Sequence, residues 1–204
     1  MPRAIQPVSV EEFVQRVGDG QKADLLDGVI YMASPDSPEA AEVNGFLQTL
    51  LNYFTRRRKL GKVYGPRSAF RLFPDSAESW APEPDVAFVL GERTKLWKGS
   101  VFQGPPDMAV EIVSTDSIDR DTITKRDAYE RAGVREYWII DLIQGKCTFL
   151  RLERGTYREV PASGTVFRSE VVQGFWLDTG WLFADELPPP DVCLEKIFGS
   201  PGPA

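Results

Sequence analysis

The sequence of 204 residues contains no histidine. Without histidine the chain cannot form a Ser-His-Asp triad, a Cys-His catalytic pair, a histidine zinc site or a histidine general base. Any catalysis must therefore depend on carboxylates, Lys, Arg, Tyr, Ser or Cys, or on a metal ion held by oxygen ligands.

Cysteine is scarce as well, and only Cys147 and Cys193 are present. They are too far apart to form a CxxC or CxxxxC pair, so the sequence contains no zinc knuckle. We expect two reduced thiols that pack as small apolar side chains. The glycine-rich phosphate loops GxxxxGK and GxGxxG are also absent.

No apolar run approaches the roughly 18–20 residues that a membrane helix needs. The first residues lack the apolar stretch of a signal peptide, so we expect a cytoplasmic protein. A hydrophobic content of 42% with 26% charged residues is typical of one medium-sized globular domain.

The charge balance is acidic, with a net charge of −6 and a pI near 4.9. This balance argues against tight DNA binding without sequence preference, which usually requires a basic surface. Net charge does not describe where the charges lie, however, and a bound divalent cation offsets part of a carboxylate cluster.

Apolar periodicity and turn residues predict the order of the elements. Helices are expected over residues 9–17, 39–59 and 119–132, and strands over residues 63–73, 85–90, 108–114 and 136–141. Hairpins are expected around Asp27-Gly28 and Arg154-Gly155, followed by more strands up to about residue 182.

The remaining segments are expected to be irregular. Residues 74–84 form a loop and residues 91–106 a mobile segment in this interpretation. The prediction is one domain over residues 1–187 and a partly disordered Pro/Gly-rich tail over residues 188–204.

Charged residues in apolar strands indicate the chemistry. Glu111 is surrounded by Met108-Ala109-Val110 and Ile112-Val113, and a carboxylate buried there is costly unless it is paired, protonated or bound to a metal. Asp85 opens a similar strand, where strand ends commonly bind ligands. Lys125 follows on the next helix, which can fold back over the strand ends. Two carboxylates and a lysine suit phosphodiester hydrolysis assisted by Mg²⁺.

Each of these residues also has a purely structural interpretation. Glu111 could form a buried ion pair with Arg126 or Arg135. Asp85 could be a turn or cap residue, and Lys125 could be a solvated helix residue. The functional interpretation depends on their order and on their strand–strand–helix setting.

Two other clusters leave alternatives open. The basic run Arg56-Arg57-Arg58-Lys59 could contact a phosphate backbone or could only stabilise the end of a helix. The aromatic residues near the C-terminus could form core or a dimer face; they are Phe175, Trp176, Trp181 and Phe183.

Several runs together resemble the Uma-type endonuclease family of the PD-(D/E)xK restriction-endonuclease-like superfamily. The resemblance covers roughly residues 9–182. It is carried by Leu25-Leu26-Asp27-Gly28, Pro84-Asp85-Val86, Val110-Glu111-Ile112-Val113, Asp121 with Lys125 and Tyr129, and Ala132-Gly133-Val134-Arg135-Glu136-Tyr137-Trp138-Ile139-Ile140-Asp141.

The resemblance implies an α/β (α+β) restriction-endonuclease-like core, with a mixed central sheet, flanking helices and additional hairpins. It implies Mg²⁺ or Mn²⁺ bound by Asp85, Glu111 and the main-chain carbonyl of Ile112. The usual superfamily lysine lies two residues after the glutamate, at Val113 here. In this family it lies on the following helix, which matches Lys125.

One position departs from the family pattern. Many members carry a histidine–glutamine pair where this chain has Ala40-Ala41, and its loss would weaken or abolish activity if the pair handles metal or substrate. Glu42 and Asp27 are candidate helpers of the site. Arg120 and Arg126 are candidate phosphate contacts.

We therefore expect a metal-dependent endonuclease that cleaves DNA, with a homodimer suited to cutting both strands. The alternative is a non-catalytic nucleic-acid-binding or assembly module that retains the fold. A metal-free hydrolase using Ser114 or Cys147 lacks a visible base.

Overall fold

The computed structural model describes residues 7–17 and 21–199. Its centre is a mixed sheet of strand order β11-β10-β9-β8-β5-β3, in which β8 and β9 are parallel and the other neighbours antiparallel. The strands are β3 (Gly61–Tyr64), β5 (Val86–Leu90), β8 (Met108–Val113), β9 (Glu136–Asp141), β10 (Lys146–Glu153) and β11 (Thr156–Glu159).

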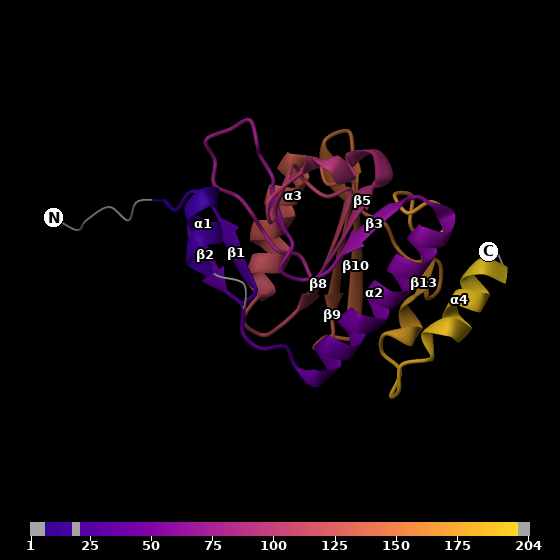
Figure 1. The fold of residues 1–204 in the computed structure, drawn as a ribbon. Coiled ribbons are helices and arrows are strands. Elements are labelled where there is room, and N and C mark those ends of the chain that lie inside the picture. The colour runs from indigo at the N-terminus through magenta and orange to yellow at the C-terminus, as the bar shows by residue number, and fades with distance from the viewer. Residues whose placement is uncertain (1–6, 18–20, 200–204) are drawn as a thin grey trace.

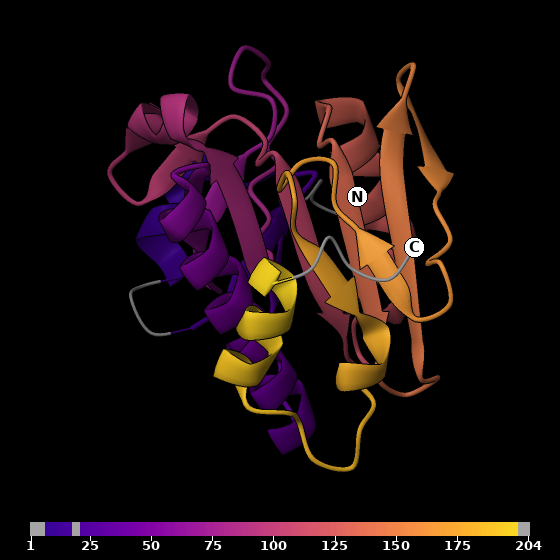
Figure 2. The same ribbon diagram turned by 90° about the vertical axis from the view of Figure 1, so that its right-hand side faces the viewer.

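Helices cover both faces of this sheet (Figure 1). Helix α3 (Lys125–Ala132) lies on one side, and α2 (Pro38–Arg58) and α4 (Pro190–Gly199) lie on the other. Figure 2 shows α4 alongside α2, near the short pair β12 (Val166–Arg168) and β13 (Trp176–Asp178).

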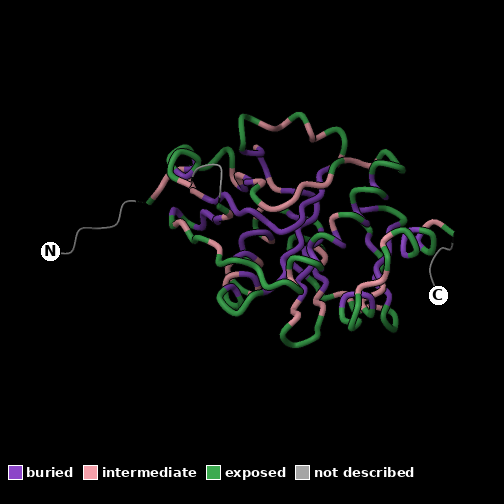
Figure 3. Tube along the Cα trace, turned by 60° about the horizontal axis from the view of Figure 1, so that its bottom comes forward, coloured by how far each residue is buried: buried purple, intermediate pink, exposed green. Residues whose placement is uncertain are grey.

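The central strands β5 and β8 are apolar on both faces because each face packs on a helix layer. Their alternate side chains, such as Val110 and Ile112, join the core beneath α2, whereas Ala109 and Val113 join the core beneath α3. Figure 3 shows the buried residues gathered at the middle of the molecule. This two-sided burial explains why a charged residue in β8 is exceptional.

The N-terminal part lies beside the α3 layer. Helix α1 (Val10–Val17) packs on the hairpin of β1 (Ala23–Leu26) and β2 (Val29–Met32). The turn Asp27-Gly28 has φ values of 49° and 76°, the left-handed conformation that this sequence predicts. A further small sheet joins β4 (Ala69–Arg71), β7 (Val101–Gln103) and β6 (Trp97–Lys98).

Most predicted elements are confirmed. The first two helices, both hairpins and the strands around residues 85–90, 108–114 and 136–141 occur at the expected positions, within a residue or two. The helix expected over residues 119–132 is a π-helical turn, Arg120–Thr124, followed by α3. Gly133 ends α3 in the left-handed conformation, with φ 85°. Residues 18–20, where the first helix was expected to end, lie outside the described residues.

The predicted strand over residues 63–73 is wrong. It is two strands in separate sheets, because the chain turns between them and Arg67 adopts a left-handed φ of 68°. Residues 91–106 are also more regular than expected. They contain a 3₁₀ helix (Gly91–Leu96) and strands β6 and β7, since Trp97 packs against Phe70 and Phe102.

The predicted tail contains α4. Cys193, Leu194 and Ile197 on this helix are buried in the core beneath α2, so the segment contributes packing that its Pro/Gly content conceals. Residues 200–204 lie outside the described residues. Cys193 and Cys147 are both free thiols, as expected.

Residues of both clusters whose roles the sequence left open make structural contacts, and a phosphate contact by the run Arg56–Lys59 stays a prediction. Arg57 and Arg58 lie over the ring of Phe198, at 5.2 Å and 5.6 Å from its centroid, at the end of α2. Of the C-terminal aromatic residues, all but Phe183 are buried in the core. Across the described residues, no helix combines the length and the apolar character needed to cross a membrane.

Candidate active site

Asp85 and Glu111 lie across from each other on adjacent strands. The β5–β8 register pairs Val86 with Val110, so continuing it by one residue places Asp85 opposite Glu111. Residues opposite each other in an antiparallel pair share a face of the sheet. Oδ2 of Asp85 also accepts a hydrogen bond of 2.7 Å from the main-chain N–H of Ile112, which fixes this carboxylate to β8.

Lys125 reaches the same place from α3. Its Nζ lies 2.8 Å from Oδ2 of Asp24, 3.1 Å from Oε2 of Glu111 and 3.2 Å from Oδ1 of Asp121. The preceding residues, Arg120–Thr124, form a π-helical turn, an irregularity that is frequent at functional sites. The helix therefore folds back over the strand ends as expected and pairs Lys125 with Glu111, whereas Asp85 is paired with another lysine, Lys22.

Glu111 is not paired with Arg126 or Arg135, the arginines considered from the sequence. Arg135 instead lies 3.1 Å from Asp107, and Arg126 lies 2.9 Å from its neighbour Asp127. Arg126 is thus at the surface, while Glu111 is fully buried.

Lys22 and Asp24 are members of the site that the sequence analysis missed. Nζ of Lys22 lies 2.5 Å from Oδ1 of Asp85, and Asp24 holds Lys125. Asp24 could have been found by the signal used for Glu111, because it is a carboxylate in the apolar run Ala23-Asp24-Leu25-Leu26. Lys22 gives no such signal, since its role depends on the docking of the β1–β2 hairpin.

Burial and charge set the protonation of the site. Burial raises the pKa of Glu111 to about 8, although the nearby Lys125 ammonium opposes the shift. Burial also disfavours the charged form of Lys125, but Asp24, Glu111 and Asp121 outweigh it and hold the Lys125 pKa well above its usual value. The cluster therefore combines a lysine held in its charged form with a carboxyl group that binds its proton more tightly than an exposed glutamate does.

The cluster gathers carboxyl oxygens around two lysines. Within the described residues, Asp24, Asp85, Glu111 and Asp121 form ion pairs with the ammonium groups of Lys22 and Lys125. The buried Oδ1 of Asp121 has no hydrogen-bond donor, although Lys125 lies within ion-pair distance. The cluster is thus short of positive charge, and oxygen ligands are those that Mg²⁺ prefers.

Within the described residues, no group of three His, Cys, Asp or Glu side chains is arranged to hold a metal ion. All four carboxyl groups make an ion pair with a lysine, and Asp85 and Glu111 are the two that lie opposite each other across β5 and β8. Proteins commonly bind Mg²⁺ through one or two carboxylates together with several waters.

The other predicted residues lie at various distances from this cluster. Arg120 stacks over the ring of Tyr31 at 5.5 Å, and its buried Nε has no hydrogen-bond partner. Asp27 is in the exposed hairpin turn, and Glu42 is exposed on α2. Their roles as helpers stay predictions.

The Ala40-Ala41 position lies in the first turn of α2. Ala40 packs against the core beneath this helix, on the face of the sheet opposite to Glu111. The main-chain N–H of Ala40 donates to Oγ of Ser37, which caps the helix.

The fold has a counterpart among solved structures. The crystal structure of a putative nuclease belonging to DUF820 from Anabaena variabilis matches with a TM-score of 0.72 and 13% sequence identity, over 87% of this chain and 98% of that chain. At this identity the similarity shows the fold, a mixed α+β restriction-endonuclease-like core. No curated protein matches the chain.

Comparison of the sequence with protein-family models gives the family. Residues 10–180 match the protein family described as Uma2, putative restriction endonuclease, and this span includes the whole cluster from Lys22 to Lys125. The chain therefore belongs to the Uma2 family of putative restriction endonucleases.

Proposed function

We propose that this protein is an endonuclease that hydrolyses DNA phosphodiester bonds with Mg²⁺ or Mn²⁺. The family and the structural match support a nuclease. The observation that carries the proposal is the placement of Asp85 across from Glu111, with Lys125 against Glu111. This arrangement joins two oxygen donors and one ammonium group on a single face of the sheet.

Asp85 and Glu111 would hold the cation, with the main-chain carbonyl of Ile112 as a further oxygen ligand. When bound, the cation would polarise a phosphate oxygen and lower the pKa of a bound water. The hydrogen bond from the Ile112 N–H to Asp85 fixes one ligand relative to the strand that supplies the others. Such a fixed arrangement lowers the cost of reorganisation during the reaction.

Lys125 has the role of offsetting negative charge on the reacting phosphate or of orienting the attacking water. Asp24 and Asp121 hold its ammonium group in place, and the hydroxyl of Tyr129 holds Glu111. These residues are buried, so electrostatic interactions here are stronger than in bulk water.

Further substrate contacts would lie outside this buried cluster. We propose that Arg120, whose Nε lacks a partner, contacts a phosphate group of the substrate. Arg126, at the surface of α3, is a second candidate contact. A homodimer would present two such sites to a duplex, and sedimentation velocity would measure the oligomeric state.

A second candidate is a nucleic-acid-binding or assembly module without catalysis. Two observations favour it: Lys22 and Lys125 already neutralise the metal-binding carboxylates, and the chain has a net charge of −6. Metal binding separates the two candidates, because the module needs none.

Nicking of supercoiled plasmid at low salt with Mn²⁺ tests the proposal. Low salt matters because electrostatic DNA binding weakens steeply as ionic strength rises. The wild type should nick, Glu111→Gln should not, and the exposed control Glu159→Gln should match the wild type. Nicking by Glu111→Gln would mean that a different catalytic centre cuts the DNA. Absence of both nicking and Mn²⁺ binding in the wild type would favour the non-catalytic module.

A further inference from the structure

The two lysines of the cluster differ in burial and in the number of their partners. The side chain of Lys125 is 2% exposed, and three carboxylates surround its ammonium group. The side chain of Lys22 is 19% exposed and makes one ion pair, with Asp85. Lys125 is thus fixed on every side, whereas Lys22 can leave its partner by breaking one contact.

Lys22 also occupies the oxygen of Asp85 that is not tied to the main chain. Oδ2 accepts the hydrogen bond from the N–H of Ile112, and Oδ1 lies 2.5 Å from Nζ of Lys22. A cation that binds Asp85 would meet this ammonium group at close range. Like charges so close repel strongly, so Lys22 and a divalent cation compete for the same carboxylate.

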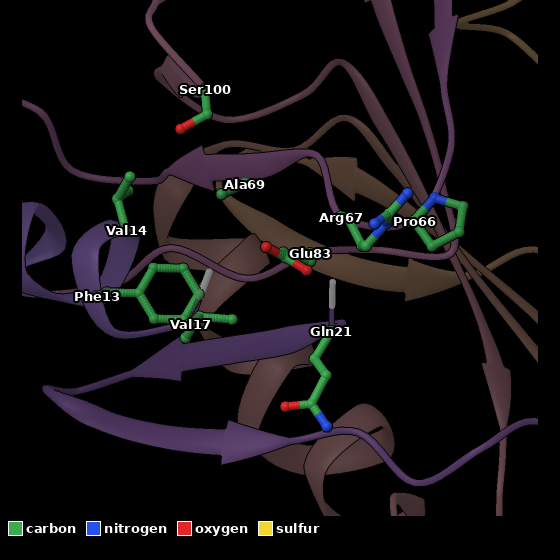
Figure 4. Close-up of a pocket in the computed structure, with 9 residues that line it drawn as sticks. All are labelled: Phe13, Val14, Val17, Gln21, Pro66, Arg67, Ala69, Glu83 and Ser100. Carbon is green, nitrogen blue, oxygen red and sulfur yellow. The ribbon is translucent and has the colours of Figure 1, made fainter. Parts of the chain in front are cut away.

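A second carboxylate is available next to this pair. Glu83 lies two residues before Asp85, is 6% exposed, and uses Oε2 to accept a hydrogen bond from the N–H of Ala23. The charges of Lys22 and of Arg67, which lines the same cavity, already act on the Glu83 carboxyl. Glu83 and Gln21, the neighbour of Lys22, line a cavity of about 260 Å³ (Figure 4).

We propose that Lys22 is an exchangeable counter-cation: it neutralises Asp85 in the cation-free protein and moves to Glu83 when a divalent cation takes Asp85. A cavity borders Glu83, and this carboxylate gives the ammonium group a new partner, so no buried charge is left unpaired. This inference rests on the proposed function, because it needs a cation at Asp85.

The test is a double-mutant cycle read out as Mn²⁺ affinity, by calorimetry or by electron paramagnetic resonance of free Mn²⁺. Lys22→Met removes the competitor and should bind Mn²⁺ about tenfold more tightly than the wild type. Lys22→Arg keeps the charge and should stay near the wild type. The exposed Lys62→Met is the matched control and should not change the affinity.

Glu83→Gln is the second substitution of the double-mutant cycle. Glutamine keeps an oxygen for the N–H of Ala23 but removes the charge that receives Lys22. It should weaken Mn²⁺ binding several-fold in the wild-type background and leave it unchanged in the Lys22→Met background. A merely structural role for Glu83 would weaken binding equally in both, and that result would overturn the proposal.

The remaining outcomes separate this inference from the proposed function. Mn²⁺ binding that is lost in Glu111→Gln but unchanged in Lys22→Met would overturn the role of Lys22 and leave the metal site intact. Binding by Lys22→Met alone would overturn the exchange, because the wild-type lysine would then stay on Asp85 and block the cation. Absence of binding in every variant would overturn both proposals.

Discussion

The hydroxyl group of Tyr129 donates a hydrogen bond of 3.0 Å to Oε1 of Glu111, and both side chains are buried. Oε2 of the same carboxyl lies 3.1 Å from Nζ of Lys125, so α3 holds both oxygens of Glu111. The geometry of the site therefore depends on how α3 docks on strand β8.

Replacing Tyr129 by phenylalanine should destabilise the protein by about 1–3 kcal/mol, because a buried carboxyl oxygen loses its donor. Nicking activity should fall as well, since Glu111 would no longer be fixed. Urea unfolding measures the first effect. Tyr53→Phe is the control: Tyr53 is half-exposed, and its substitution should change stability by less than about 0.5 kcal/mol. Equal effects of the two substitutions would contradict the role of the hydroxyl.

The stability of the cation-free protein should depend on pH through Glu111. Burial raises its pKa from the ordinary 4.5 to about 8, so the folded protein binds this proton more tightly than the unfolded chain. The resulting stabilisation is fully present below pH 4.5 and is lost as the pH rises through about 8. The free energy of unfolding of the wild type, relative to Glu111→Gln, should therefore fall over this range.

Urea unfolding in the presence of a chelator measures this difference. Glu83, whose pKa burial raises to about 7, titrates in both proteins, so the comparison with Glu111→Gln isolates Glu111. A difference that does not vary with pH would show that Glu111 has no raised pKa in the folded state.

Lys125→Met should be strongly destabilising, by about 3–5 kcal/mol, because it leaves buried carboxylates without their counter-ion. Lys146→Met, at an exposed position of β10, should be nearly neutral. Thermal unfolding compares the two. A loss in Lys125→Met that shrinks at low pH, where the carboxylates are protonated, would confirm that the cost is electrostatic. A small loss at neutral pH would mean that the three carboxylates do not depend on Lys125.

Glu136 provides the contrast of a buried glutamate with a structural role. Its carboxylate accepts hydrogen bonds from Oγ of Ser169, Nε1 of Trp138 and the N–H groups of residues 170 and 171. Glu136→Ala should therefore cost about 3 kcal/mol or more of stability. The Mn²⁺ affinity of Glu136→Ala, measured at a temperature at which this variant is folded, should equal that of the wild type. A loss of Mn²⁺ affinity would give this residue a part in the site. Glu153→Ala, at an exposed strand end, is the control.

The sequence by itself determined the central strands of the sheet and indicated Asp85, Glu111 and Lys125 as candidate site residues. The apolar runs of β5, β8 and β9 are continuous, so their strand character depends on local pattern alone. Asp85 and Glu111 stand out within those runs because an ionised group is costly in an apolar strand. The family resemblance then gave Lys125 its role among the many lysines of the chain.

Tertiary structure alone decided the rest of the site. Lys22 precedes β1 by one residue in an ordinary polar setting, and only the docking of the β1–β2 hairpin brings its ammonium group to Asp85. The same packing turns Glu136, which resembles Glu111 as a carboxylate in an apolar strand, into an anchor for residues 169–171. The local sequence indicates which residues are buried. The partners of a buried charged group, however, come from segments far apart in the chain. Those partners decide whether the charged group binds a cation or stabilises the fold.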